Sequence, residues 1–136
     1  MPRRTASAVG PAPLLSRRGQ VRVREWHEPP EPLDLAAGVK HRFRIVNFHT
    51  FMFMANLKIE IKDGSGLLSG RALAKDGRDL PENQQTVRPA QQVVSIGETY
   101  DFEFIPEKPA DYRLEIFDPI FGKVMNTVRI HARQHN

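Results

Sequence analysis

Cysteine is absent from all 136 residues of this chain. Its absence excludes disulfide bonds, thiolate metal sites and cysteine nucleophiles at once. It does not fix the cellular compartment, because many secreted proteins of this size lack disulfides. Long apolar runs are also absent, and no stretch approaches the roughly 20 apolar residues that a membrane span requires. We therefore expect no membrane span, and the length suits one domain with its own core.

The excess of positive charge lies entirely within the first 20 residues. Residues 1–20 contain four arginines and no acidic residue, whereas residues 21–136 contain 16 basic and 16 acidic residues. The apolar run from Pro11 to Leu15 is much shorter than a secretory signal needs. We predict a disordered basic arm over residues 1–20, one domain over residues 21–136, no convincing signal peptide and no nucleic-acid partner.

Apolar and polar residues alternate in several short stretches, which is typical of half-buried strands. The turns between them carry glycine with aspartate, as at Asp63–Gly66 and Asp76–Gly77. Strands at this spacing predict an all-β sandwich or barrel without a convincing helix. The alternation predicts a core made of Phe43, Ile45, Leu57, Ile59, Val94, Ile96, Tyr100, Phe102, Phe104, Leu114, Ile116 and Val128.

Four motifs occur in a characteristic order: His41–Asn47 (HRFRIVN), Ala74–Gly77 (AKDG), Gly97–Phe104 (GETYDFEF) and Asp111–Glu115 (DYRLE). Together they resemble the multicopper oxidases of the laccase type, and most closely their copper-free middle domain, over about residues 33–130. The resemblance implies a Greek-key β-sandwich of the cupredoxin, or plastocyanin-like, type. It also implies other copper-oxidase domains or subunits as partners and an extracytoplasmic location.

The same resemblance shows which copper ligands are missing. Copper-bearing domains of the family carry a "YHCH"-like run on the strand that here begins at Tyr112. Aligning the tyrosines places Glu115, Ile116 and Phe117 where His-Cys-His would stand. A blue-copper site requires a thiolate, and no His-x-His pair occurs anywhere in the sequence. We therefore expect no type-1 or trinuclear copper, no cofactor, no catalytic residue and no enzyme activity from this chain alone.

Two groups of residues remain as metal candidates. His49, Met52 and Met54 combine an imidazole with two thioethers, which are ligands that suit Cu(I). Methionines more often fill an irregular core, and we favour that interpretation. His131 and His135 are four residues apart, but they fall at a strand end and in the terminal tail, where this spacing does not define one face.

We interpret the remaining acidic residues in predicted turns, and the two tyrosines, as structural. Asp63, Asp76, Asp79 and Glu82 lie in predicted turns, where carboxylates usually bond the backbone. Tyr112, with Tyr100 as the competing candidate, is expected to pack at a Greek-key corner and to hydrogen-bond backward across it.

These patterns favour a non-catalytic cupredoxin-like domain with a structural or docking role. One alternative is a small Cu(I)-binding or copper-delivery protein that uses His49, Met52 and Met54. A second alternative is an immunoglobulin-like adhesion module, which would display an exposed apolar or aromatic patch.

Overall fold

The computed structural model describes residues 5–7, 20–22, 30–48 and 56–134. Strands make up most of this part, and its single helical element is the short 3-10 turn η2 (Glu82–Gln84). The strands are β1 (Thr5–Ser7), β2 (Gln20–Arg22), β3 (Leu33–Ala36), β4 (His41–Val46), β5 (Asn56–Asp63), β6 (Gly66–Leu67), β7 (Ser69–Lys75), β8 (Arg78–Asp79), β9 (Val87–Pro89), β10 (Gln91–Ser95), β11 (Thr99–Phe104), β12 (Ala110–Phe117) and β13 (Val124–Arg133).

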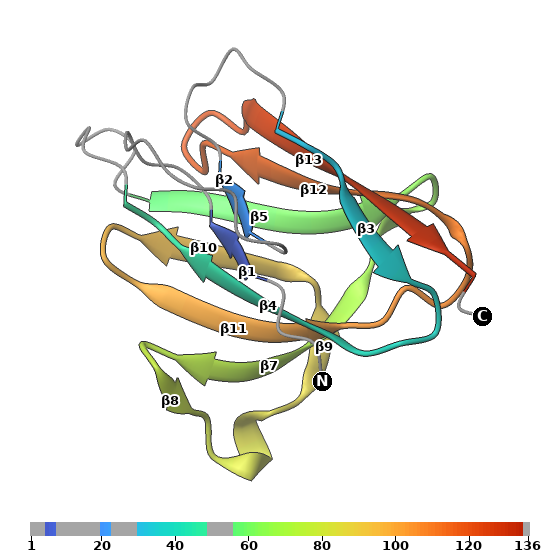
Figure 1. Cartoon of the computed structure of the whole chain (residues 1–136). Coiled ribbons are helices and arrows are strands. Elements are labelled where there is room, and N and C mark those ends of the chain that lie inside the picture. The colour runs from blue at the N-terminus through green and yellow to red at the C-terminus, as the bar shows by residue number, and fades with distance from the viewer. Residues whose placement is uncertain (1–4, 8–19, 23–29, 49–55, 135–136) are drawn as a thin grey trace.

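Two sheets face each other to form a sandwich (Figure 1). The first, here called the β5 sheet, has the order β10-β5-β12-β13-β3, with β6 beside β5. The second, the β11 sheet, has the order β4-β11-β7-β8, with β9 beside β7. The chain crosses between the sheets several times, as from β3 to β4, from β4 to β5 and from β9 through β10 and β11 to β12. Strand β3 runs parallel to β13, whereas the other pairs within these two sheets are antiparallel. This arrangement confirms the predicted all-β cupredoxin-like sandwich.

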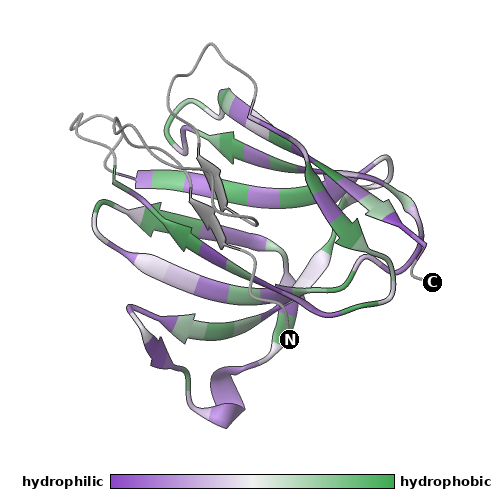
Figure 2. Ribbon diagram, viewed as in Figure 1, coloured by the Kyte–Doolittle hydropathy of each residue, from purple (hydrophilic) through white to green (hydrophobic). Residues whose placement is uncertain are grey.

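Hydrophobic and hydrophilic residues alternate along the longer strands (Figure 2), and the core lies between the sheets because alternate residues of these strands are buried there. In β4, His41, Phe43 and Ile45 are buried while Arg42 and Arg44 are half-exposed on the outer face. Nine of the twelve predicted core residues are buried, and the core also includes buried residues that the prediction omitted. The main additions are Leu33, Leu35, Ile61, Ala90, Tyr112, Ile130 and Ala132.

The core prediction is wrong at Ile96, whose side chain is 45% exposed. Ile96 follows the end of β10 and precedes Gly97, which adopts a positive φ of 81°. The chain turns there, so the two-residue alternation of a strand no longer governs where the side chain points. Tyr100 and Phe102 are only partly buried and pack against the edge of the core.

The predicted turns are confirmed by their backbone geometry. Asp76 and Gly77 have φ values of 50° and 80° and connect the β7–β8 hairpin. Positive φ at both central residues is the requirement of the hairpin turn that Asp-Gly favours. The carboxylate of Asp63 accepts hydrogen bonds from the backbone and the hydroxyl of Ser65, as expected for an aspartate that stabilises a turn.

Tyr112 is the corner tyrosine, as the sequence predicts. Its hydroxyl donates to the carbonyl of Lys108 at 2.9 Å, and its ring lies edge-on to Phe104 with centroids 5.6 Å apart. The competing candidate, Tyr100, instead donates to the carboxylate of Glu98 at 3.1 Å. Tyr112 therefore fixes the connection between β11 and β12, where the chain crosses from one sheet to the other.

In the predicted basic arm, residues 5–7 form β1, which pairs in parallel with β2 and lies beside β4. Gln20 begins β2, and arm residues 1–4 and 8–19 lie outside the described part of the chain, so their disorder and the domain boundary stay predictions. No helix among the described residues is long and apolar enough to cross a membrane.

Candidate functional site

The strand that the resemblance aligns with the copper-binding run is β12. Ile116 is completely buried in the core between the sheets, and Phe117 is almost buried beside it. The ammonium of Lys62 lies 4.9 Å from the centre of the Phe117 ring. Apolar packing thus occupies the two positions aligned with cysteine and the second histidine, and neither side chain can ligate copper.

Glu115, the third aligned position, belongs to a ladder of charges on the outer face of the β5 sheet. Lys62 Nζ lies 2.9 Å from a carboxylate oxygen of both Glu60 and Glu115, and Lys58 Nζ lies 3.2 Å from Glu60. The hydrogen bonds to Glu60 and then Glu115 raise the pKa of Lys62. Burial alone would raise the pKa of Glu60, but the hydrogen bonds from Lys62 and Lys58 outweigh it and lower that pKa. Glu115 is therefore engaged in ion pairing.

Exposed apolar side chains gather where β12 ends, at the end of the sandwich that we call the apolar end. Phe121 is 85% exposed, Ile120 75% and Phe48 61%, and Ile96 and Val124 are exposed as well. The backbone N–H of Gly97 donates to the carbonyl of Asn47 at 2.9 Å, which holds the β10–β11 turn beside the end of β4. The ladder of β12 and β13 closes at Phe117 and Val124 at the same end (Figure 1).

The loop that carries Ile120 and Phe121 is held by Asp118. The Asp118 carboxylate accepts from the backbone N–H of Ile120 at 2.8 Å, and its carbonyl accepts from Gly122 N–H at 2.8 Å. Its own N–H donates to the carbonyl of Lys123 at 2.9 Å. A backbone fixed by these bonds presents two large apolar residues to solvent, which is a feature of interaction surfaces. The signal available in the sequence was Ile-Phe placed between turn residues, in Asp118–Gly122.

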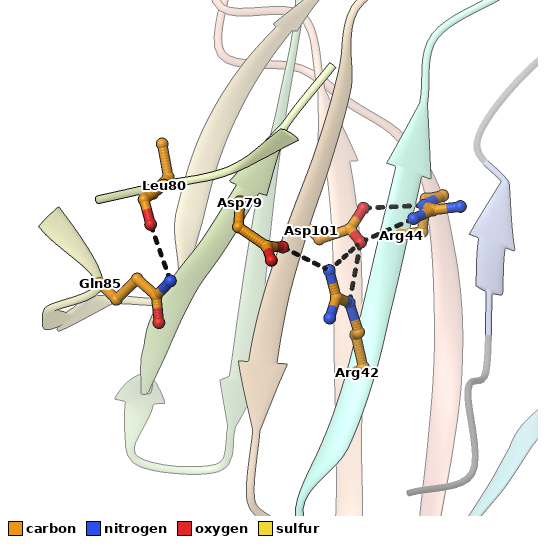
Figure 3. Close-up of polar contacts among 6 residues, drawn as sticks. All are labelled: Arg42, Arg44, Asp79, Leu80, Gln85 and Asp101. Atoms are coloured by element: carbon orange, nitrogen blue, oxygen red, sulfur yellow. Dashed lines mark hydrogen bonds and ion pairs between the residues drawn. The ribbon is translucent and has the colours of Figure 1, made fainter. Parts of the chain in front are cut away.

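A second polar cluster lies on the outer face of the β11 sheet. The carboxylate of Asp101 lies between Arg42 and Arg44 (Figure 3), with N–O distances of 2.8 Å to Arg42 and of 2.9 and 3.0 Å to Arg44. Burial opposes ionisation of Asp101, but the hydrogen bonds from Arg44 and Arg42 are stronger and lower its pKa. The hydrogen bond to Asp101 raises the pKa of Arg44. This cluster ties β4 to β11 and leaves no unpaired carboxylate for chemistry.

The predicted Cu(I) ligands His49, Met52 and Met54 all lie outside the described residues, so this site stays a prediction. Phe48 and Asn56, which flank them, are described, and Phe48 lies at the apolar end. Within residues 5–7, 20–22, 30–48 and 56–134, no group of three His, Asp or Glu side chains could hold a metal ion.

The histidines that the structure describes make structural contacts. His41 is buried and donates from Nε2 to the carbonyl of Ala36 at 3.0 Å, which connects β4 to the end of β3. His131 lies within β13, 2.7 Å from a carboxylate oxygen of Asp111 on β12. His135, its proposed metal partner by spacing, lies outside the described residues.

The acidic residues predicted to occupy turns remain separate from one another. Asp76 accepts from the backbone N–H of Thr99 at 3.0 Å, and Asp79 lies 3.7 Å from Arg42 in the Asp101 cluster. Glu82 begins the exposed turn η2. The contact of Asp76 agrees with the turn role predicted from the sequence, whereas Asp79 lies in β8 and pairs with a side chain.

No protein-family model and no curated protein matches this chain. Solved multicopper oxidases do match its fold. One from Pediococcus acidilactici superposes with a TM-score of 0.62 over 94% of this chain and 29% of that chain, at 7% identity. A blue copper oxidase from Nitrosomonas europaea gives a TM-score of 0.58 over 84% of this chain and 33% of its own, at 15% identity.

A third structure, a metallo-oxidase of the same kind from Campylobacter jejuni, gives a TM-score of 0.58 over 76% of this chain and 21% of its own, at 9% identity. The chain therefore has the cupredoxin-like fold of a multicopper-oxidase domain. It spans about a third or less of the length of these oxidases.

Proposed function

We propose that this chain is a non-catalytic cupredoxin-like domain with a structural or docking role in, or beside, a multicopper oxidase. The observation that carries the proposal is Ile116, a fully buried core residue at the position where the family's copper-bearing domains place the cysteine ligand. Glu115 and Phe117 on either side are engaged with Lys62. Copper chemistry would then belong to other domains or subunits, and extracytoplasmic placement stays an expectation from the resemblance.

The apolar end supports the docking part of the proposal. The Asp118-braced loop displays Ile120 and Phe121, and Phe48 is exposed at the same end. Such a patch was also the feature expected of an adhesion module. The fold, however, matches domains that are covalently combined with others in oxidases much longer than this chain. We therefore interpret the apolar end as a surface for another oxidase domain or subunit.

Copper loading tests the non-catalytic part. The purified chain is incubated with Cu(II) or Cu(I), desalted, and measured for copper content, absorbance near 600 nm (the thiolate-to-copper band) and oxygen consumption with a phenolic reductant. We expect no blue band and no turnover. Stoichiometric copper together with oxidase turnover would overturn the proposal. If the chain binds Cu(I) without turnover and the Met52→Leu/Met54→Leu double variant binds it equally well, then the predicted Cu(I) site is not where the copper binds.

Site-specific photocrosslinking in the native cell tests the docking part. A photoreactive residue replaces Phe121 at the apolar end, and the matched control replaces Glu107, which is exposed at the other end. We expect the Phe121 position, and not the Glu107 position, to crosslink to a polypeptide that mass spectrometry identifies as a copper oxidase. Crosslinking of both positions to the same set of abundant proteins would contradict a specific docking surface.

A further inference from the structure

A cavity of about 440 Å³ opens on one side of the sandwich, where the chain passes from β9 in one sheet to β10 in the other. Its volume falls in the range of roughly 300–1,000 Å³ that is typical of small-molecule sites. The rings of Tyr100 and Phe102 and the side chain of Ile59 form its apolar lining. On β7, the small residues Gly70 and Ala72 belong to the lining.

The outer wall of this cavity is a structured loop. The side-chain amide of Gln85 donates to the carbonyl of Leu80 at 2.8 Å, as Figure 3 shows, and closes the loop on itself. Leu80 N–H donates to Leu73 of β7 at 2.8 Å, and Ala72 N–H donates to Thr86 at 3.4 Å. These bonds attach both sides of the loop to β7, so the cavity is formed before any ligand arrives.

The lining carries an excess of positive charge. Lys75 is paired with Glu98 at 3.1 Å, and Asp101 is neutralised by its two arginines. Arg71 donates only to the carbonyl of Gln85, at 3.4 Å. Arg88 has no ion-pair or hydrogen-bond partner within the part of the chain that the structure describes.

Arg88 also lies on the face of its strand that borders the cavity. In the β7–β9 ladder it stands directly opposite Gly70, and directly paired residues share one face of a sheet. Gly70 approaches the β11 backbone closely, because a Cβ built there would lie 3.1 Å from the carbonyl oxygen of Glu103. The same Cβ would lie 3.6 Å from the Phe102 ring, so the position opposite Arg88 favours glycine and lies directly beside the aromatic lining.

We propose that this cavity binds a small aromatic monocarboxylate. Its ring would lie against Tyr100 and Phe102, where aromatic groups gain from stacked or edge-to-face contact. Its carboxylate would pair with Arg88, whose planar fork matches a carboxylate in two parallel hydrogen bonds. Arg71 adds positive charge at the same opening. The inference is independent of the proposed function, since it uses neither β12 nor the loop at residues 118–123.

Titration with naphthoate tests the proposal, with ¹H–¹⁵N chemical shifts and calorimetry as readouts and naphthylmethanol as the neutral probe. We expect naphthoate to shift the amides of residues 70–74, 86–88 and 90–92 and to bind more tightly than the alcohol. Arg88→Gln should weaken naphthoate binding about tenfold, as for loss of a charge-assisted pair. The matched control Arg129→Gln removes an exposed arginine from β13, in the other sheet, and should leave affinity unchanged.

In a second experiment, a larger side chain at position 72 fills the cavity. Ala72→Phe should abolish binding of both probes, and Ala72→Leu provides a smaller filling if the phenylalanine variant does not fold. Absence of naphthoate binding at millimolar concentration would overturn the proposal. Equal affinity for acid and alcohol, or equal losses in the Arg88 and Arg129 variants, would overturn the role of Arg88 and with it the carboxylate specificity.

Discussion

The two ends of the sandwich differ in their side chains far more than in their backbones. At the end we call the corner end, Gly38 N–H donates to Pro106 at 2.7 Å and Tyr112 donates to Lys108. At the apolar end, Gly97 N–H donates to Asn47 at 2.9 Å, and Asp118 braces its loop. Among the described residues, both ends are closed by hydrogen bonds, and the largest exposed apolar side chains gather at the apolar end. In the loop that carries Ile120 and Phe121 these bonds hold the backbone, so loose chain structure does not explain the exposure of those two residues, which supports a binding role for that end.

Matched truncations of two phenylalanines should give the largest difference between the ends. Phe104→Ala removes a buried ring that contacts Phe43 and Tyr112, and should lower the free energy of unfolding by about 3–5 kcal/mol. Phe121→Ala removes an exposed ring and should change it by less than about 0.5 kcal/mol. Urea unfolding measures both, with Phe104→Leu as the milder variant. A large loss in Phe121→Ala would make the apolar end part of the core.

Acid should weaken the apolar end through Glu98. Hydrogen bonds from the Ser95 backbone, together with Lys75 and Tyr100, lower the pKa of this carboxyl from 4.5 to about 2. A lowered folded-state pKa stabilises the fold above the unfolded value, and this stabilisation is lost as pH falls from 4.5 through 2. With allowance for solvent screening, Glu98→Gln should cost about 2 kcal/mol at neutral pH and progressively less toward pH 2.

The control for that pH series is Glu107→Gln, which removes an exposed carboxylate at the corner end. Its unfolding free energy should follow that of the unmodified chain across the same range. Parallel curves for Glu98→Gln and the unmodified chain would contradict the assigned role of Glu98 in the β10–β11 turn.

The turn glycines should behave alike at both ends. Gly38 and Gly97 have φ values of 76° and 81°, and a Cβ at either would meet nothing within 4 Å. Alanine at each should therefore cost about 1–2 kcal/mol from backbone strain alone. Thermal unfolding compares the two variants. A loss at only one end would show that the backbones differ after all.

The smallest expected effect is at the corner tyrosine. Tyr112→Phe removes the hydrogen bond to Lys108 but keeps the buried ring, and should cost about 1 kcal/mol. Tyr100→Phe removes a bond to the partly exposed Glu98 and should cost less than that, about 0.5 kcal/mol. Equal losses in urea unfolding would argue against a special role for the corner.

Sequence reasoning predicted the elements that depend on local chemistry. Alternation located β4, β11 and β12, and the Asp76–Gly77 pair located a hairpin turn with the required positive φ values. It was wrong at Ile96, because the strand ends one residue earlier and the alternation was extended too far. The corner role of Tyr112 was predicted correctly, since both partners lie within five residues of each other.

The candidate sites depended on contacts between distant segments, and the sequence did not reveal these. Nothing in the GETYDFEF motif indicates that Asp101 pairs with two arginines 57 and 59 residues away. The position of Arg88 opposite Gly70 follows from the β7–β9 register, which no local pattern specifies. Ile120 and Phe121 could have been noticed between turn residues, but their exposure required the surrounding structure.

The sequence by itself determined the strands, the turns and the lack of any thiolate for copper, because these follow from period-two patterning, turn chemistry and residue type. Alternation also predicted that Ile116 lies in the core, but only the tertiary structure decided that the charged residues on each outer face pair with one another. It also decided that one end of the sandwich displays apolar side chains while a basic, aromatic cavity opens on its side. Those features arise where strands far apart in the chain meet, and packing in three dimensions sets them.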